Sequence, residues 1–215
     1  MTPAPIHPAR LCAADRKQQL LETAFDFFSR KGFDGTTTKE IAAAAAVTEA
    51  VIFRHFPTKQ ALYTAVLDYR LQFNDTHGWL PAAKEAMERN DDEGLLRMIA
   101  THIVRSYRTD PRFERMMLFA ALEGHALALD YIREQTFPVF QLLRDYILRR
   151  QAEGALRHVP LGVVFTAIFG MAHHYCQITQ MFGYPALNTS DEAMVDGFVR
   201  VVLDGLRPVP SEKHA

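Results

Sequence analysis

The sequence predicts an all-α protein. Apolar residues recur at the three- and four-residue spacing of a buried helix face, and no run shows a convincing two-residue period typical of a strand. Hydrophobic residues make up 48% of the 215 residues, enough to fill a sizeable core. We therefore expect a folded globular protein built of helices.

Short helical segments occupy the first sixty residues. The first has apolar residues on one face from Leu20 to Phe28, with Asp15 as its expected N-cap and Gly32 as its C-terminal stop. Thr37 and Glu40 form a capping-box pair that opens a second helix through residue 45. The spacing thus predicts two helices separated by a short connection.

A third short helix follows a tight turn. The turn lies at residues 46–47, and Thr48 is the expected N-cap of a helix over 49–55. Pro57 and Thr58 then open a helix over 59–73. Two short helices joined by a tight turn and packed on a third have the geometry of a helix-turn-helix (HTH), which holds a recognition helix in the major groove of DNA.

The remainder of the chain predicts longer helices over residues 93–108, 111–129, 132–152, 160–183 and 190–206. We expect a three-helix HTH DNA-binding domain at 13–60 and a larger helical domain at 61–206, to which the family resemblance described below assigns effector binding and dimerisation. Residues 1–12 and 207–215 are expected to be disordered tails, because these proline-containing ends cannot bury enough apolar surface.

A series of short motifs is spaced along residues 16–67, about a quarter of the chain. They are Phe25 to Phe28, Gly32-Phe33, Thr37-Thr38, Ile41-Ala42, Ala45-Ala46-Val47-Thr48, Phe53, His55-Phe56 and Lys59 to Leu62. With these motifs, residues 16–67 resemble the N-terminal domain of the TetR family of bacterial transcription regulators. Beyond residue 67, only the number and length of the helices are similar to the family.

The resemblance implies which residues meet double-stranded DNA. Thr38 and Lys39 would contact the backbone, Val51 a thymine methyl group, and Glu49 a cytosine amino group. Arg54 would contact guanine or phosphate, while His55 and Lys59 would contact phosphates. The full predicted set is Thr37, Thr38, Lys39, Glu49, Ala50, Val51, Phe53, Arg54, His55 and Lys59.

Three positions depart from the family pattern. Ala46 stands where glycine is usual, so it either adopts a left-handed conformation at a cost of about 1 to 2 kcal/mol or belongs to a different turn. Phe53 replaces the usual tyrosine and could serve packing alone, while Glu49 replaces a frequent lysine. Arg54 and Lys59 would read as solvated charges outside this motif, but within it we expect DNA contacts.

The second domain is rich in aromatic, Met and His residues. A hydrophobic effector pocket is one interpretation, and ordinary helical core is the alternative for any single residue. The predicted ligand-binding residues are Met98, His102, Tyr107, Met117, His125, Phe137, Phe169, His174 and Tyr175.

Apolar faces at residues 160–183 and 190–206 could bury within their own domain or pair with a second copy. The family resemblance implies a homodimer through these helices, with two HTH domains facing a palindromic operator.

We expect no membrane insertion, because the most apolar run, over residues 159–172, is shorter than a spanning helix and contains Pro160. Two cysteines and no signal core favour a reducing cytoplasm.

The motif search favours no enzyme, metal site or cofactor. The sequence has no phosphate-binding glycine loop and no nucleophile elbow, and no histidine pair has the helical spacing of a zinc site.

The net charge of the chain is near zero, and the first sixty residues carry eight basic and six acidic groups. The hypothesis of DNA binding therefore rests on the helix-turn-helix pattern and not on charge. We expect a repressor released by a small, largely apolar ligand. The alternatives are an activator and a ligand-binding or processing helical protein with a non-functional HTH.

Overall fold

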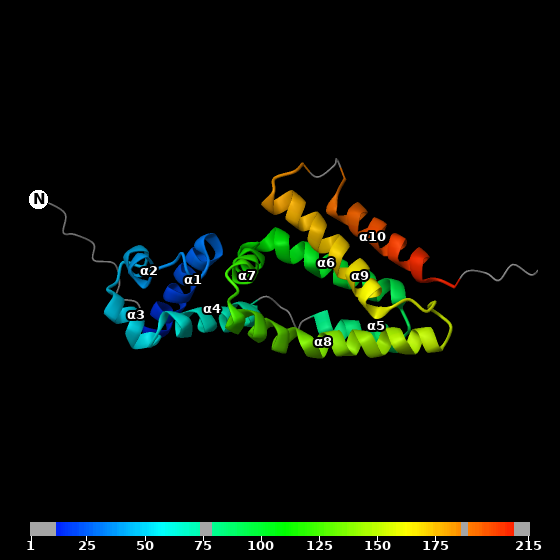
Figure 1. Ribbon diagram of the computed structural model, residues 1–215, viewed down its shortest axis with the longest axis horizontal. Helices are drawn as coiled ribbons and strands as arrows, with labels where there is room; N and C mark the ends of the chain where they lie inside the picture. Colours follow the sequence, from blue (N-terminus) through cyan, green and yellow to red (C-terminus); the bar gives the residue numbers. More distant parts are fainter. Residues whose placement is uncertain (1–11, 74–78, 186–188, 209–215) are drawn as a thin grey trace, which may run out of the picture. The chain divides into compact units, whose positions relative to one another are not determined.

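The computed structural model describes residues 12–73, 79–185 and 189–208. All regular structure in these ranges is helical, which confirms the predicted all-α class. The elements are α1 (Ala13–Lys31), α2 (Thr38–Ala44), α3 (Glu49–His55), α4 (Lys59–Phe73), α5 (Trp79–Glu88), α6 (Asp92–Thr109), α7 (Arg112–Leu122), α8 (Ala126–Ala152), α9 (Leu161–Cys176), the π-helical turn η1 (Gln177–Met181) and α10 (Asp191–Leu206) (Figure 1).

Two compact units make up the chain. Unit 1 comprises residues 1–72 and 112–129, and unit 2 comprises residues 73–111 and 130–215. The compact units therefore interleave along the sequence, whereas the predicted functional division was a single boundary after residue 60. That functional division stays a prediction. Of the two predicted tails, residues 1–11 and 209–215 lie outside the described part of the chain.

Unit 1 is built on α1. The N-cap of α1 is Cys12, whose sulfur accepts from the Asp15 backbone N–H at 3.4 Å, so the prediction of Asp15 as the cap was wrong by one turn. The Thr37–Glu40 capping box at the start of α2 is confirmed. Thr48 is the N-cap of α3 as predicted, but its side chain makes no capping hydrogen bond. Helix α7 packs along α1 and closes the unit.

The core of unit 1 joins all of its helices. Phe25 and Phe28 of α1, Ile52 of α3 and Met116 of α7 are all fully buried. Each fully buried apolar side chain contributes about 1.5 to 3 kcal/mol relative to exposure. This shared core holds α2 and α3 against α1.

The turn between α2 and α3 settles the question about Ala46. Its φ is +53°, so this alanine adopts the left-handed conformation where the family usually has glycine. Backbone bonds from Ala46 N to Ala43 O at 3.2 Å and from Val47 N to Ala42 O at 2.9 Å hold the turn. The chain thus keeps the tight turn and accepts the strain of an L-residue in it.

The helix boundaries after residue 110 differ from the prediction of helices over 111–129 and 132–152. Gly124, at φ +63°, follows α7, and the backbone N–H of His125 reaches Ala120 O at 2.9 Å, a pattern that closes a helix. Helix α8 then starts at Ala126 and runs through residues 130 and 131, and through Pro138. The helix breaks at Gly124 because the backbone there is left-handed, a conformation that glycine adopts without steric cost.

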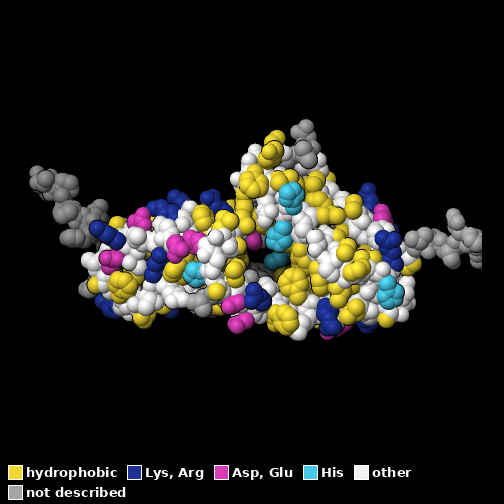
Figure 2. All heavy atoms as spheres, viewed as in Figure 1, with side chains coloured by type: hydrophobic (Ala, Val, Ile, Leu, Met, Phe, Trp, Pro, Cys, Tyr) yellow, Lys and Arg dark blue, Asp and Glu magenta, His cyan; other side chains and the backbone are white. Residues whose placement is uncertain are grey.

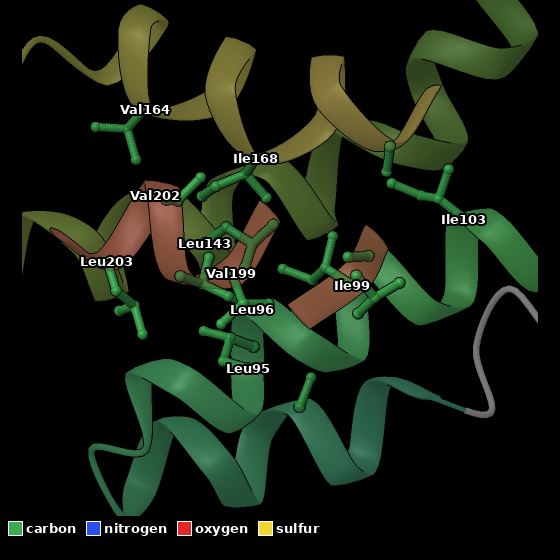
Figure 3. Close-up of a cluster of buried hydrophobic side chains, with 14 of the residues drawn as sticks. Leu95, Leu96, Ile99, Ile103, Leu143, Val164, Ile168, Val199, Val202 and Leu203 are labelled. Carbon is green, nitrogen blue, oxygen red and sulfur yellow. The ribbon is translucent and has the colours of Figure 1, made fainter. Parts of the chain in front are cut away.

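Unit 2 is a bundle in which α6 lies against α5, α9 and α10. Figure 3 shows the buried cluster, in which Leu95, Leu96 and Ile99 of α6 meet Ile168 of α9 and Val199 of α10. Helix α5 was not among the predicted segments. It buries Ala83, Ala86 and Met87 against this core.

The segment Leu161–Met181 is long and apolar enough to cross a membrane by length and composition alone. One such helix is weak evidence, because core helices of soluble proteins share this composition. In the structure α9 ends at Cys176 and packs on α6 and α10, so the predicted helix over 160–183 is divided into α9 and η1.

Candidate nucleic-acid interface

Helix α3 presents a mixed apolar and basic surface. Ala50, Phe53 and Arg54 are exposed, and Phe53 keeps 44% of its surface accessible although it is aromatic. Val51 and His55 are half-buried at the edges of this face, and Ile52 is fully buried beneath it. An exposed aromatic ring beside a guanidinium suits contact with base edges and phosphates.

Hydrogen bonds to two carboxylates hold the hydroxyls at the start of α2. The Thr37 hydroxyl accepts from Glu40 N at 3.2 Å and donates to Glu40 Oε2 at 2.8 Å. The Thr38 hydroxyl donates to Glu49 Oε1 at 2.6 Å, which links the first residue of α3 to the start of α2. Both hydroxyls are thus hydrogen-bonded within the protein, whereas Lys39, the next residue of α2, is exposed.

The carboxylate of Glu40 is strongly stabilised in its charged form. Lys31 donates to Glu40 Oε1 at 2.6 Å, and the backbone N–H of Thr37 donates to Oε2 at 3.0 Å. The ion pair with Lys31, followed by the hydrogen bonds from Thr37, lowers the pKa of Glu40 to about 2. The start of α2 therefore carries a fixed negative charge at neutral pH.

Lys59 begins α4 and points over an aromatic ring. Its ammonium lies 4.3 Å from the centroid of Phe33, which follows the end of α1. A cation over a ring face gains about 0.5 to 2 kcal/mol, depending on solvent exposure. This contact places a positive charge beside the first turn of α4, where the helix dipole also favours anions.

The sequence reasoning missed how these predicted DNA residues are tied together. Thr38 and Glu49 were treated as separate contacts, yet they bond to each other. Phe33 was read as part of a motif only, yet it lies under Lys59. The periodicity of the sequence indicates neither pairing, because the partners lie in different segments of the chain.

In unit 2, two of the predicted ligand-binding residues are buried in polar networks. Tyr107 is 2% exposed and its hydroxyl lies 3.3 Å from Nδ1 of His173, a residue outside the predicted set, and burial lowers the pKa of His173. His174, which was in the set, is exposed. Tyr175 donates to Asp191 at 2.7 Å.

The other predicted ligand residues divide between the units. Met98 packs against the core of unit 2, His102 stacks near Trp79, and Phe169 lies in an aromatic cluster with Phe140 and Phe165. Phe137 is 57% exposed. Met117 and His125 belong to unit 1.

One cavity in the core of unit 2 has a volume of about 20 Å³, and none of the nine predicted ligand residues lines it. A space of this size holds about one water molecule. Within the described ranges, no three His, Cys, Asp or Glu side chains come together as a metal-binding group.

Comparison with known proteins agrees with this geometry. The TetR_N family model, described as bacterial regulatory proteins of the tetR family, matches residues 20–66, which cover α2, α3 and most of α1 and α4. The HTH-type transcriptional regulator YvkB of Bacillus subtilis (strain 168) is 48% identical over 196 residues, covering 88% of this chain and 96% of that protein. This chain belongs to the TetR family.

Other relatives extend over both units of this TetR-family chain. The HTH-type transcriptional regulator RutR of Escherichia coli (strain K12) is 26% identical over 201 residues, covering 90% of this chain and 91% of RutR. The crystal structure of AibR, in complex with isovaleryl coenzyme A and operator DNA, matches with a TM-score of 0.63 at 22% identity, covering 86% of this chain and 97% of that one. This TetR-family protein is thus a DNA-binding transcription regulator with an N-terminal HTH, and its relatives are regulators rather than enzymes.

Proposed function

We propose that this TetR-family regulator is a cytoplasmic homodimeric repressor that binds a palindromic operator through α3 and leaves it when a small, largely apolar ligand binds unit 2. The observation that carries the DNA part is the exposed row Ala50, Phe53 and Arg54 on a helix whose opposite face is anchored by buried Ile52. An anchored helix with an exposed reading face is what major-groove recognition requires.

The predicted DNA residues take distinct roles in this proposal. Arg54 contacts guanine or phosphate, Phe53 and Val51 contact thymine methyl groups, and Lys39 contacts the backbone. Glu49 accepts a hydrogen bond from Thr38, and in this proposal its carboxylate also accepts from a cytosine amino group. Lys59 and His55 neutralise phosphates at the edge of the interface.

The proposal of a homodimer rests on the outer face of α9 and α10. Val163 of α9 and Val201 of α10 remain 57% and 60% exposed, and they line a groove of about 170 Å³ together with Ala167, Met171 and Gly205. Only 28% of the most apolar window in Leu161–Met181 is buried. Figure 2 shows hydrophobic side chains on the surface over α9. Such a face is unusual on a soluble monomer, and a second copy would cover it symmetrically.

The ligand part of the proposal rests on aromatic and polar groups of unit 2. Phe140, which is 38% exposed, forms a cluster with the half-buried Phe165 and Phe169 at centroid distances of 5.2 to 6.2 Å. The buried Tyr107 pairs with the half-buried His173. Because the core cavity of about 20 Å³ is too small for an effector, a ligand bound inside the core would require the core to open. The structure of AibR holds isovaleryl coenzyme A, so acyl-coenzyme A thioesters are the first group of probes.

The test begins by selecting duplexes from a random pool with the full-length protein and sequencing the bound fraction. Fluorescence anisotropy then measures affinity at several salt concentrations for the wild type, Arg54→Ala and Lys59→Ala. The matched control is Arg144→Ala, an exposed arginine of α8. We expect a palindrome to be enriched and Arg54→Ala to weaken binding by about 1 to 3 kcal/mol. The salt slope is the steepness with which the logarithm of the binding constant falls with the logarithm of the salt concentration, and Lys59→Ala should lower it by about 1.

Two results would contradict the proposal. Failure to enrich any duplex at low salt would reject operator binding and favour a ligand-binding protein with a non-functional HTH. Identical operator affinity with and without a panel of acyl-coenzyme A thioesters and apolar carboxylates would reject release by those ligands. A repressor and an activator are then separated by a reporter gene placed behind the selected operator.

A further inference from the structure

The end of α7 makes a close contact with the α1–α2 turn of unit 1. The backbone N–H of Phe33 donates to Glu123 Oε2 at 3.0 Å, and that of Asp34 donates to Glu123 Oε1 at 3.2 Å. One carboxylate thus accepts two consecutive N–H groups beyond the last turn of α1. Hydrogen bonds to an ionised acceptor are about twice as strong as neutral ones, and paired bonds also fix orientation.

The geometry of Gly32 shows that this approach is tight. A Cβ atom at Gly32 would lie 2.0 Å from Glu123 Oε1 and 3.1 Å from the Phe119 ring, and φ at this glycine is +73°. Glycine is therefore favoured here by the backbone conformation, and a Cβ atom would also displace the Glu123 carboxylate from its present position.

His125 extends the contact to α4. Its ring centroid lies 4.4 Å from Phe33 and 4.9 Å from Tyr63 of α4, and its Nδ1 accepts from Ala128 N at the start of α8. Phe33 therefore contacts both His125 and the ammonium of Lys59, which is 4.3 Å from the Phe33 ring centroid. The α7–α8 corner touches the aromatic ring on which a proposed phosphate-binding lysine rests.

The other end of α7 is fastened to α1 as well. The guanidinium of Arg112 lies 4.4 Å from the Phe25 ring centroid and 3.4 Å from Glu22 Oε2. Contacts thus hold α7 to α1 at the first residue of α7 and to the α1–α2 turn just past its last residue. A displacement of α7 would then be felt at the α1–α2 turn and at the first turn of α4.

We propose that Glu123 and His125 are positioning residues of the DNA-binding head: they hold the α1–α2 turn and Phe33, and thereby aim Lys59 and the start of α2 at the DNA backbone. This inference rests on the proposed function. Neither residue is expected to touch DNA.

The experiment uses the full-length protein and the duplex that the wild type enriches. Glu123→Gln is the central variant, because its amide keeps the size but can accept only one of the two N–H groups. Glu123→Ala removes both bonds, and Glu134→Ala removes an exposed carboxylate of α8 as the matched control. We expect both Glu123 variants to bind about tenfold more weakly with a salt slope lower by about 1, and the control to bind like the wild type.

A double-mutant cycle separates positioning from a general loss of stability. If Glu123 acts through Lys59, Lys59→Ala should weaken binding far less in the Glu123→Gln protein than in the wild type. Thermal unfolding gives a readout without DNA. Gly32→Ala should lower the Tm less in the Glu123→Ala protein than in the wild type, because the carboxylate oxygen that a Cβ atom would approach to 2.0 Å is then absent.

The outcomes distinguish this inference from the proposed function. If the wild type enriches a duplex but both Glu123 variants bind it with wild-type affinity and salt slope, or if the effects with Lys59→Ala are independent, the positioning role is overturned while operator binding stands. An equal Tm loss from Gly32→Ala in both backgrounds would overturn the contact itself. If the wild type enriches no duplex, the proposed function fails and the positioning role fails with it.

Discussion

Replacing Ala46 by glycine should stabilise this protein. Ala46 adopts φ +53° in the turn between α2 and α3, and an L-residue in that conformation costs about 1 to 2 kcal/mol. Glycine removes this strain but adds about 0.5 to 1 kcal/mol of chain entropy to the unfolded state. Ala46 is exposed, so its methyl group contributes little burial. The net gain in unfolding free energy is therefore about 0.5 to 1 kcal/mol.

A matched control lies three residues earlier. Ala43 is equally exposed but has helical geometry in α2, so Ala43→Gly should destabilise the protein by about 0.5 to 1 kcal/mol. The same substitution at two neighbouring positions is thus expected to have opposite signs. The difference comes from backbone conformation alone, since neither methyl group is buried.

Thermal unfolding followed by circular dichroism at one fixed protein concentration measures both changes. For a chain of this length we expect the Tm to rise by roughly 1 to 4 °C for Ala46→Gly and to fall by a similar amount for Ala43→Gly. A fall in Tm for Ala46→Gly would mean that the alanine is not strained in the turn. The reasoning would then be refuted, even if the operator affinity stayed the same.

Three further predictions concern titratable and buried polar groups. Because the folded pKa of Glu40 is about 2, its stabilising effect is present above the ordinary value of 4.5 and lost as pH falls toward 2; Glu40→Gln should flatten the decline of Tm over that range. Burial lowers the pKa of His173, so the unfolded state binds a proton before the folded state does as pH falls below about 6.5, and stability is lost. His173→Phe should reduce this loss, which a series of Tm measurements from pH 5.5 to 8 would detect. An unchanged slope of Tm against pH would contradict the prediction. The buried hydroxyl of Tyr63 has no hydrogen-bond partner among the described residues, so Tyr63→Phe should leave the unfolding free energy unchanged or raise it by about 1 kcal/mol in urea titrations. Tyr69→Phe is the control, because that hydroxyl donates to Glu22 at 2.8 Å and its loss should destabilise.

Local signals account for what could be predicted of the fold. The helical class, the capping box of Thr37 and Glu40, and the succession α2, turn, α3 follow from periodicity and from capping residues a few positions apart. The break at Gly124 was missed because an isolated glycine is tolerated inside a helix, and sequence alone does not show that this one is left-handed. Helix α5 was missed because its apolar face is short.

The candidate interface shows the same division. The sequence by itself determined the family and which side chains lie on α3, because recognition-helix positions follow from spacing along one helix. Only the tertiary structure decided that Thr38 bonds to Glu49, that His173 rather than His174 meets Tyr107, and that Glu123 reaches the backbone of Phe33 from 90 residues away. Such partners come from separate helices, and packing selects them after the chain has folded, so no periodicity along the sequence encodes them.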